Sequence, residues 1–167
     1  MSTLDDGRGD RPGGLTHIDE ADSARMVDVS GKAVTVREAT ARGRVLCSAE
    51  VVAALRGEGL PKGDALAVAR LAGIQGAKRT PELVPLAHPV AVHAVSVELT
   101  VLDGGVDIEA TVRTADRTGV EMEALTAVAV AALALVDMVK ALDKRTRVTD
   151  VRVVAKSGGR SGDWRAE

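Results

Sequence analysis

The chain has 167 residues, 46% of them apolar and 28% charged, with a net charge of −2 at neutral pH, which is typical of one soluble globular domain. The near balance of charges and the single aromatic residue, a Trp, argue against a nucleic-acid-binding surface. Cys47 is the only cysteine, which excludes an intramolecular disulfide and a cysteine-ligated cluster, and no run of about 18 apolar residues predicts a membrane span. The first residues lack the apolar stretch of a signal peptide, so we expect a cytoplasmic protein.

The N-terminal region combines a tail with a first strand. Residues 1–14 are polar and rich in Gly and Pro, which predicts a disordered tail before a single catalytic domain over 15–167. Residues 34–47 are rich in β-branched side chains and predict a strand with an irregularity at Gly43.

Two helices are expected next. Ser48 is expected to cap a helix over 49–57, and Asp64 a helix over 65–78. Glycine has a low helix propensity, so two positions of the second helix are expected to be weak points: Gly73 and Gly76. Three prolines in residues 79–90 predict a stiff, extended loop.

The second half begins with a predicted β-hairpin. Residues 90–101 and 106–115 alternate between apolar and polar side chains around the turn at Gly104 and Gly105. The longest helical pattern, over 118–143, follows the hairpin.

The C-terminal part has a start signal for the long helix and a last strand followed by a Gly-rich segment. Thr118 precedes Glu121 by three residues, which is the spacing of a capping box at the start of the long helix. Residues 147–156 predict a last strand, followed by a Gly-rich segment. The cations and glycines of this segment indicate either a flexible tail or a phosphate-binding loop.

This order of elements predicts an α+β fold of the ferredoxin-like type, an antiparallel sheet with helices packed on one face. The other face is then open. Since some strands carry Val and Ala on both faces, we expect a second subunit to cover it, and therefore an oligomer.

The long helix carries charged residues near both ends. Asp137 and Lys140 lie three residues apart on one side, so they form either a structural ion pair or an acid/base pair. Glu123 lies roughly 21 Å from Asp137 along the helix axis, at 1.5 Å per residue. If both ends are functional, we expect them to serve one site from two chains.

His88 lies in the proline-rich loop, where it is either structural or part of a rigid binding loop. Cations near turns and element ends favour a polyphosphate ligand in a chain whose histidines lack metal-ligand spacing: Arg25, Lys32, Lys62, Lys140, Lys156 and Arg160. The residues alone thus indicate an oligomeric α+β protein with a site for an anionic ligand.

Several stretches also resemble the cyclic pyranopterin monophosphate synthase family, the C proteins of molybdenum cofactor biosynthesis. These are LTHID (15–19), MVDVSGKAVTVREATARG (26–43), KGDALAVARLAGIQGAKRTPELVPLAHP (62–89), TGVEMEALTAVAVAAL (118–133), DMVKALDK (137–144) and AKSGGRSGD (155–163). They occur in the family's order and cover nearly the whole chain after the tail.

The resemblance implies a ferredoxin-like subunit in a homohexamer, a trimer of dimers with the site at a dimer interface. It implies a lyase that converts (8S)-3′,8-cyclo-7,8-dihydroguanosine 5′-triphosphate, the product of a radical-SAM GTP cyclase, into cyclic pyranopterin monophosphate and pyrophosphate. No cofactor, protein metal site, nucleic acid or membrane is expected, and a role of Mg²⁺ in the release of pyrophosphate is left open.

The resemblance also implies roles for individual residues. The catalytic residues would be Asp137, Lys62 and Lys140. The substrate-binding residues would be Leu86, Ala87, His88, Glu121, Met122, Glu123, Lys32, Lys156 and Arg25. Ala87 replaces a cysteine that is common in the family, so a thiol there is not essential.

Two other functions remain open. A non-catalytic subunit could hold a nucleotide triphosphate for regulation, using the same cations. A purely structural oligomer would leave the polar groups of residues 62–64 and 86–89 without a purpose. A carboxylate close to a polyphosphate favours the enzyme, because binding alone does not require one.

Overall fold

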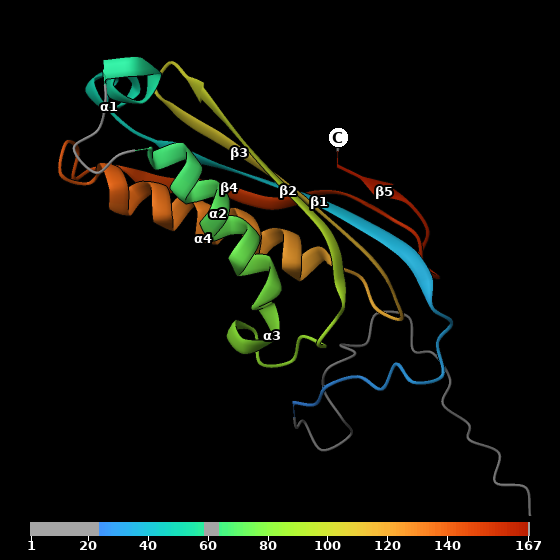
Figure 1. Cartoon of the computed structure of the whole chain (residues 1–167). Helices are drawn as coiled ribbons and strands as arrows, with labels where there is room; N and C mark the ends of the chain where they lie inside the picture. Colours follow the sequence, from blue (N-terminus) through green and yellow to red (C-terminus); the bar gives the residue numbers. More distant parts are fainter. Residues whose placement is uncertain (1–23, 59–63, 167) are drawn as a thin grey trace, which may run out of the picture.

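The computed structural model describes residues 24–58 and 64–166, and Figure 1 shows them as a layer of helices on one antiparallel sheet. The strands are β1 (Thr35–Leu46), β2 (Val92–Leu102), β3 (Gly105–Asp116), β4 (Arg147–Ser157) and β5 (Trp164–Arg165). The helices are α1 (Ala49–Ala53), the π-helical turn η1 (Ala54–Glu58), α2 (Ala65–Lys78), α3 (Thr80–Leu83) and α4 (Glu121–Val139). The predicted tail at 1–14 lies outside the described residues.

The strands lie in the order β2-β3-β1-β4-β5, and every pair is antiparallel. Strand β1 is therefore central, between the second strand of the β2–β3 hairpin and the strand that follows α4. The mixed α/β class with an antiparallel sheet is confirmed.

Strand β1 is irregular at the predicted position. Its pairing with β4 shifts register between Arg42 and Arg44, on either side of Gly43. A Cβ atom on Gly43 would lie 2.6 Å from Cγ1 of Val128 in α4. The missing side chain therefore lets α4 lie close against the sheet.

Both predicted N-caps are present. The Ser48 hydroxyl accepts a hydrogen bond from the Val51 amide at 3.4 Å. The Asp64 carboxylate accepts one from the Ala67 amide at 2.9 Å. Each side chain satisfies an amide that has no carbonyl partner in the first helical turn.

Helix α4 is the main core helix. It contacts β1, β3 and β4 on one side and α2 on another, and its buried residues are Glu123, Ala124, Ala127, Val128, Ala131, Ala132, Leu135 and Val139. Over 18 residues its mean hydropathy is 2.0, so by length and composition alone it could cross a membrane. Its contacts are those of a core helix.

The glycines of α2 are packing positions as well as weak points of the helix. A Cβ on Gly73 would lie 2.9 Å from the Ala127 carbonyl oxygen, and one on Gly76 would lie 2.9 Å from Cβ of Val130. Figure 1 shows α2 and α4 side by side. The absence of side chains at these two positions permits this close approach.

We expect Gly73→Ala to lower the free energy of unfolding by about 1–3 kcal/mol, because the new methyl group overlaps backbone that cannot move freely. Helix propensity alone predicts the opposite sign, a gain of about 1 kcal/mol. Denaturant unfolding measures the difference. Gly31→Ala is the matched control, since no atom lies within 4 Å of its Cβ position. An unchanged or raised stability of Gly73→Ala would show that the helices separate easily.

Two predicted helix boundaries are wrong. Helix α4 begins at Glu121 with Val120 as its N-cap and no side-chain cap, so Thr118 does not form the capping box. The Glu121 carboxylate faces Lys156 instead, at 3.4 Å. The helix ends at Val139, before the predicted end at Asp143, whose carboxylate accepts a hydrogen bond from the Ser48 amide at 2.9 Å.

The proline-rich loop also differs from the prediction. Residues 80–83 form the short helix α3, with Pro81 in its first turn, where a missing amide hydrogen costs nothing. The Thr80 hydroxyl, fully buried, donates to the Ala77 carbonyl oxygen at 3.1 Å and so joins α3 to the end of α2. The extended part of the loop begins only after α3.

The open face of the sheet is more polar than expected. Arg42 pairs with Glu109, and Arg44 pairs with Asp107, across β1 and β3. The centre of the open face is therefore charged. Large exposed apolar side chains lie both on the strands and on the helix layer: Val36, Leu102, Val148 and Val151 on the strands, and Val68, Leu71, Leu83, Met122 and Leu133 on the helices.

Candidate active site

A polar cavity of about 130 Å³ lies where α4 begins. Four cations line it, and they come from four separate segments: Lys32, Arg37, Arg117 and Lys156. Glu38 and Glu121 are the acidic residues of the lining, and the Glu121 carboxylate is the one that faces Lys156. This excess of positive charge at the N-terminus of a long helix suits a ligand that carries phosphates.

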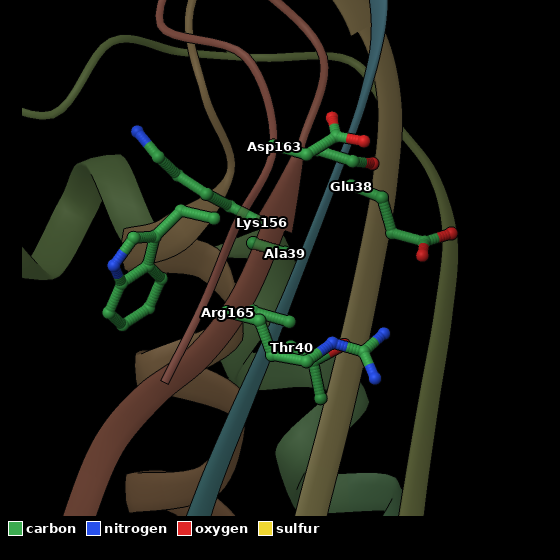
Figure 2. A pocket seen from close by; sticks show the side chains of 9 residues that line it. Glu38, Ala39, Thr40, Lys156, Asp163 and Arg165 are labelled. Carbon is green, nitrogen blue, oxygen red and sulfur yellow. The ribbon is translucent and has the colours of Figure 1, made fainter. Parts of the chain in front are cut away.

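Lys156 reaches this cavity because β4 contains a bulge. Ala41 pairs with Val153, but Thr40 pairs with Ala155, so one residue of β4 is extra. The bulge places Lys156 opposite Ala39, on the helix-covered face of the sheet. In a regular ladder Lys156 would lie opposite Glu38 on the open face. Figure 2 shows Lys156 and Glu38 pointing to opposite sides.

The Lys156 ammonium has two polar neighbours. It lies 3.4 Å from the Glu121 carboxylate and donates a hydrogen bond to the Ser161 hydroxyl at 3.1 Å. These contacts join the start of α4, the strand β4 and the Gly-rich segment around one charge.

The Gly-rich segment is an ordered turn that leads into β5, so the alternative of a flexible tail is wrong for residues 157–166. Gly158 and Gly159 both have positive φ angles, of 82° and 74°. A Cβ on Gly158 would overlap the Val36 carbonyl oxygen. The Gly158 amide donates to the Asp163 carboxylate at 3.1 Å, which closes the turn.

His88 lines a second cavity of about 520 Å³ beside the first. Its Nε2–H donates to the Val27 carbonyl oxygen at 2.5 Å, which fixes the ring and leaves Nδ1 able to accept. Arg117 and Thr118 line both cavities. The structure thus brings the His88 loop and the cationic cavity together.

Arg117 and Arg37 were missing from the sequence prediction. The Arg37 Nε–H donates to the Asp116 carbonyl oxygen at 2.9 Å, and that of Arg117 donates to the Lys32 carbonyl oxygen at 3.0 Å. They lie 80 positions apart in the chain, one inside a strand and one in a turn. Only the pairing of β1 with β3 brings them together, and no local motif marks it.

Glu123 is buried, with 2% of its surface exposed. Burial raises the pKa of its carboxyl to about 7, against the lowering effect of a hydrogen bond with its own amide, and the nearby charge of Glu121 adds to the rise. Around neutral pH this group therefore holds a proton in a substantial fraction of molecules.

The pKa of Glu123 predicts that stability falls as pH rises. Between the unfolded pKa of 4.5 and the folded value of about 7, the folded chain binds more protons, so raising pH through this range favours unfolding. We expect Glu123→Gln to remove this loss and to stabilise the chain at pH 8, relative to pH 5, by up to about 3 kcal/mol. Thermal unfolding at both pH values measures it, with the exposed Glu98→Gln as control. Equal effects at both pH values would contradict the assignment.

Asp137 and Lys140 lie at the other end of α4. The Lys140 ammonium donates to the Asp137 carboxylate at 2.5 Å, and both side chains are about three-fifths exposed, at 59% and 60%. Asp137 lies roughly 24 Å and Lys140 roughly 28 Å from Glu121 along the helix, at 1.5 Å per residue. One chain therefore keeps these two predicted catalytic residues away from the cationic cavity.

The remaining predicted residues lie in four separate parts of the chain. Leu86 and Ala87 precede His88 in its loop and are half-buried, and Met122 is 41% exposed on α4. Arg25 is exposed and directly precedes Met26, which lines the His88 cavity. Lys62 lies outside the described residues. Over 24–58 and 64–166, no group of three or more His, Cys, Asp or Glu side chains could hold a metal ion.

Comparisons with known proteins show the family of the chain. A protein from Streptomyces coelicolor named cyclic pyranopterin monophosphate synthase is 66% identical over 93% of this chain and 96% of its own length. A protein of the same name from Streptomyces griseus is 70% identical over 90% of this chain and 85% of its own length. Another from Chloroflexus aurantiacus is 57% identical over 90% of this chain and 93% of its own length. The model of the MoaC family matches residues 26–159, which include both ends of α4, the lining of the His88 cavity and that of the cationic cavity except Ser161. The chain belongs to the MoaC family.

Proposed function

We propose that this chain is a cyclic pyranopterin monophosphate synthase of molybdenum cofactor biosynthesis. It converts (8S)-3′,8-cyclo-7,8-dihydroguanosine 5′-triphosphate into cyclic pyranopterin monophosphate and pyrophosphate, a lyase reaction. The observation that carries the proposal is the high identity to relatives of that name over nearly their whole length. The cation-lined cavity supplies what such a substrate needs.

The cationic cavity is the proposed triphosphate site. Pyrophosphate leaves as negative charge develops on its bridging oxygen, and fixed cations stabilise that charge without reorganisation. Lys32 and Lys156 face this cavity, and Arg37 and Arg117 add two guanidinium groups that can contact phosphate oxygens in pairs. Arg25 directly precedes Met26, which lines the adjoining His88 cavity, and is the further cation proposed to contact the substrate.

His88, with Leu86 and Ala87, forms one proposed wall of the substrate site, and Met122 and Glu123 form a second wall. His88 is held rigidly by its bond to Val27, which suits a positioning role. The Glu121 carboxylate, paired with Lys156, lies between the proposed phosphate and ring regions.

Asp137 is the proposed acid/base, with Lys140 and Lys62 as its catalytic partners. Closure of the cyclic phosphate requires a hydroxyl oxygen to attack the α-phosphorus, the α–β phosphoanhydride bond to break, and the hydroxyl proton to pass to a base. The Asp137 carboxylate can take that proton, and its 2.5 Å contact with Lys140 stabilises the charged form.

A complete site then needs Asp137 and Lys140 from a second copy of the chain. Helix α4 has an exposed surface to which a second copy could bind. Met122, Thr126, Ala129, Leu133, Asp137 and Lys140 follow at intervals of three or four, so they form one stripe along the helix. All six are exposed or half-exposed, and Leu133 is 63% exposed. An apolar stripe that ends in charged groups is typical of a helix covered by a partner.

We propose that two copies pair their α4 stripes in antiparallel directions about a two-fold axis. Ala129 of each copy then meets Leu133 of the other, and Met122 meets Lys140. This pairing brings Asp137 and Lys140 of one copy to the cationic cavity of the other, so a pair contains two complete sites. Three such pairs would make the expected homohexamer.

The proposed setting follows from the substrate. A radical-SAM GTP cyclase would supply the cyclised nucleotide, and residues 15–167 would act as one catalytic domain in the cytoplasm. Neither nucleic acid nor a membrane enters the proposed reaction.

The proposal is tested by turnover of the purified chain with the cyclised dihydro-GTP. We expect pyrophosphate and the pterin product in equal amounts. Binding of the nucleotide without release of pyrophosphate would instead support the regulatory subunit, and absence of both would exclude the two functions together.

A further inference from the structure

The C-terminal hairpin holds one aromatic ring in a defined place. The chain has a single Trp and neither Phe nor Tyr. Trp164 begins β5 and lies directly opposite Lys156 in the β4–β5 ladder. Side chains of directly opposed residues lie on the same face with Cβ atoms about 5 Å apart. The indole is thus next to the lysine that lines the cationic cavity.

The hairpin is built rigidly enough to hold that position. The Gly158–Asp163 hydrogen bond closes its turn, and the Gly162 amide donates to the Gly159 carbonyl oxygen at 3.3 Å. Beyond the strand, the Ala166 amide donates to the Val154 carbonyl oxygen at 2.8 Å. Backbone hydrogen bonds therefore fix the chain on both sides of Trp164.

Trp164 also lines a cavity of about 330 Å³ that adjoins the cationic one. Glu38, Lys156 and Ser157 line both cavities, so the two cavities adjoin at these residues. The indole is 47% exposed, although a large apolar ring is usually covered in a folded chain. Figure 2 shows Lys156 on one side of β1, with Glu38 and Arg165 on the other.

We propose that Trp164 is a positioning residue of the site and that its indole packs against the fused heterocycle of the substrate. This inference rests on the proposed function. The described residues contain no Phe, Tyr or second Trp, so the Trp164 indole is their largest aromatic surface for stacking on a purine-derived or pterin ring. Lys156 holds the phosphate side of the same molecule, while Trp164 offers the flat surface that orients its ring.

The single Trp makes the test direct, because all indole emission comes from this position. In the Asp137→Asn chain, which should bind without turnover, we expect the cyclised dihydro-GTP to quench the emission. Inorganic triphosphate, which has no ring, should compete for the site with little quenching. Equal quenching by both probes, or none by the nucleotide at saturation, would overturn the inference.

Kinetics separate stacking from a structural role. We expect Trp164→Leu to raise KM about tenfold or more, because the stacked ring is lost. Trp164→Phe keeps a ring and should recover most of that loss, with kcat little changed in both variants. Equal KM values for Leu, Phe and Trp would overturn the inference while turnover still supported the proposed function. Emission that responds to subunit dissociation and not to nucleotide would show that a partner subunit covers the indole, and would also overturn it.

Discussion

Asp137→Asn is expected to lower turnover of the cyclised dihydro-GTP by about 10²–10⁴-fold, the usual effect of losing a general acid or base. The amide has nearly the shape of the carboxylate but cannot take up a proton. Because the side chain is 59% exposed, the fold and the oligomer should persist. Pyrophosphate release measures the effect, and size-exclusion chromatography confirms the assembly.

The matched control for this variant is Asp103→Asn. Asp103 is also an exposed acid paired with a cation, Arg56, but it lies in the hairpin turn between β2 and β3. Its variant should keep wild-type turnover. If Asp137→Asn also kept turnover within about tenfold, the base would have to be another group, because loss of a general base costs more than that.

Leu133→Arg is expected to separate the paired copies and to abolish turnover with them. Leu133 is 63% exposed in the single chain, so an arginine there costs the chain itself little stability. In the proposed pair it lies against Ala129 of the partner, near the two-fold axis, so each pair would have to bury two new charges without partners. Sedimentation measures the assembly, and thermal unfolding shows whether the separated chain is still folded.

Leu133→Met serves as the control, since it keeps an apolar side chain of similar volume and should leave both assembly and turnover intact. An arginine variant that remains a fully active oligomer would place the subunit contact on another surface. A folded, inactive variant of reduced size is the outcome that the paired stripes predict.

Much of the fold could be predicted from local patterns. The alternation over residues 90–115 identifies the hairpin, and the caps at Ser48 and Asp64 mark two helix starts correctly. These signals act within a few residues, so each can be seen in the sequence alone. The start of α4 was harder to predict, because the Glu121 carboxylate pairs with the distant Lys156 and not with a backbone amide of a local cap.

Features that depend on distant packing could not be predicted. The α2 glycines are unfavourable for a helix in isolation, and only the approach of α4 shows why they are needed. The bulge in β4 has no sequence signal of its own, yet it decides which face of the sheet Lys156 occupies. Arg37 and Arg117 were missed for the same reason, because they meet only through strand pairing.

The separation of the two ends of α4 was anticipated from helix geometry, and the structure confirms it. Glu121 lies at one end of the helix and the Asp137–Lys140 pair at the other. The distance between two residues along a helix axis follows from their positions in the sequence alone, because the rise per residue is fixed. The surface through which a second copy contributes its part of the site is a proposal, and it rests on the exposed stripe of α4.

The shared site is tested most directly by mixing two inactive variants. Lys156→Ala damages the cationic cavity, and Asp137→Asn damages the opposite end of α4. A mixed pair contains one site with both defects and one intact site, so randomly mixed oligomers should recover about a quarter of wild-type pyrophosphate release. Co-expression of the two chains with different tags, followed by a single-turnover assay, provides the measurement. Recovery near that level would support a site built from two copies, and a mixture as inactive as its parents would contradict it.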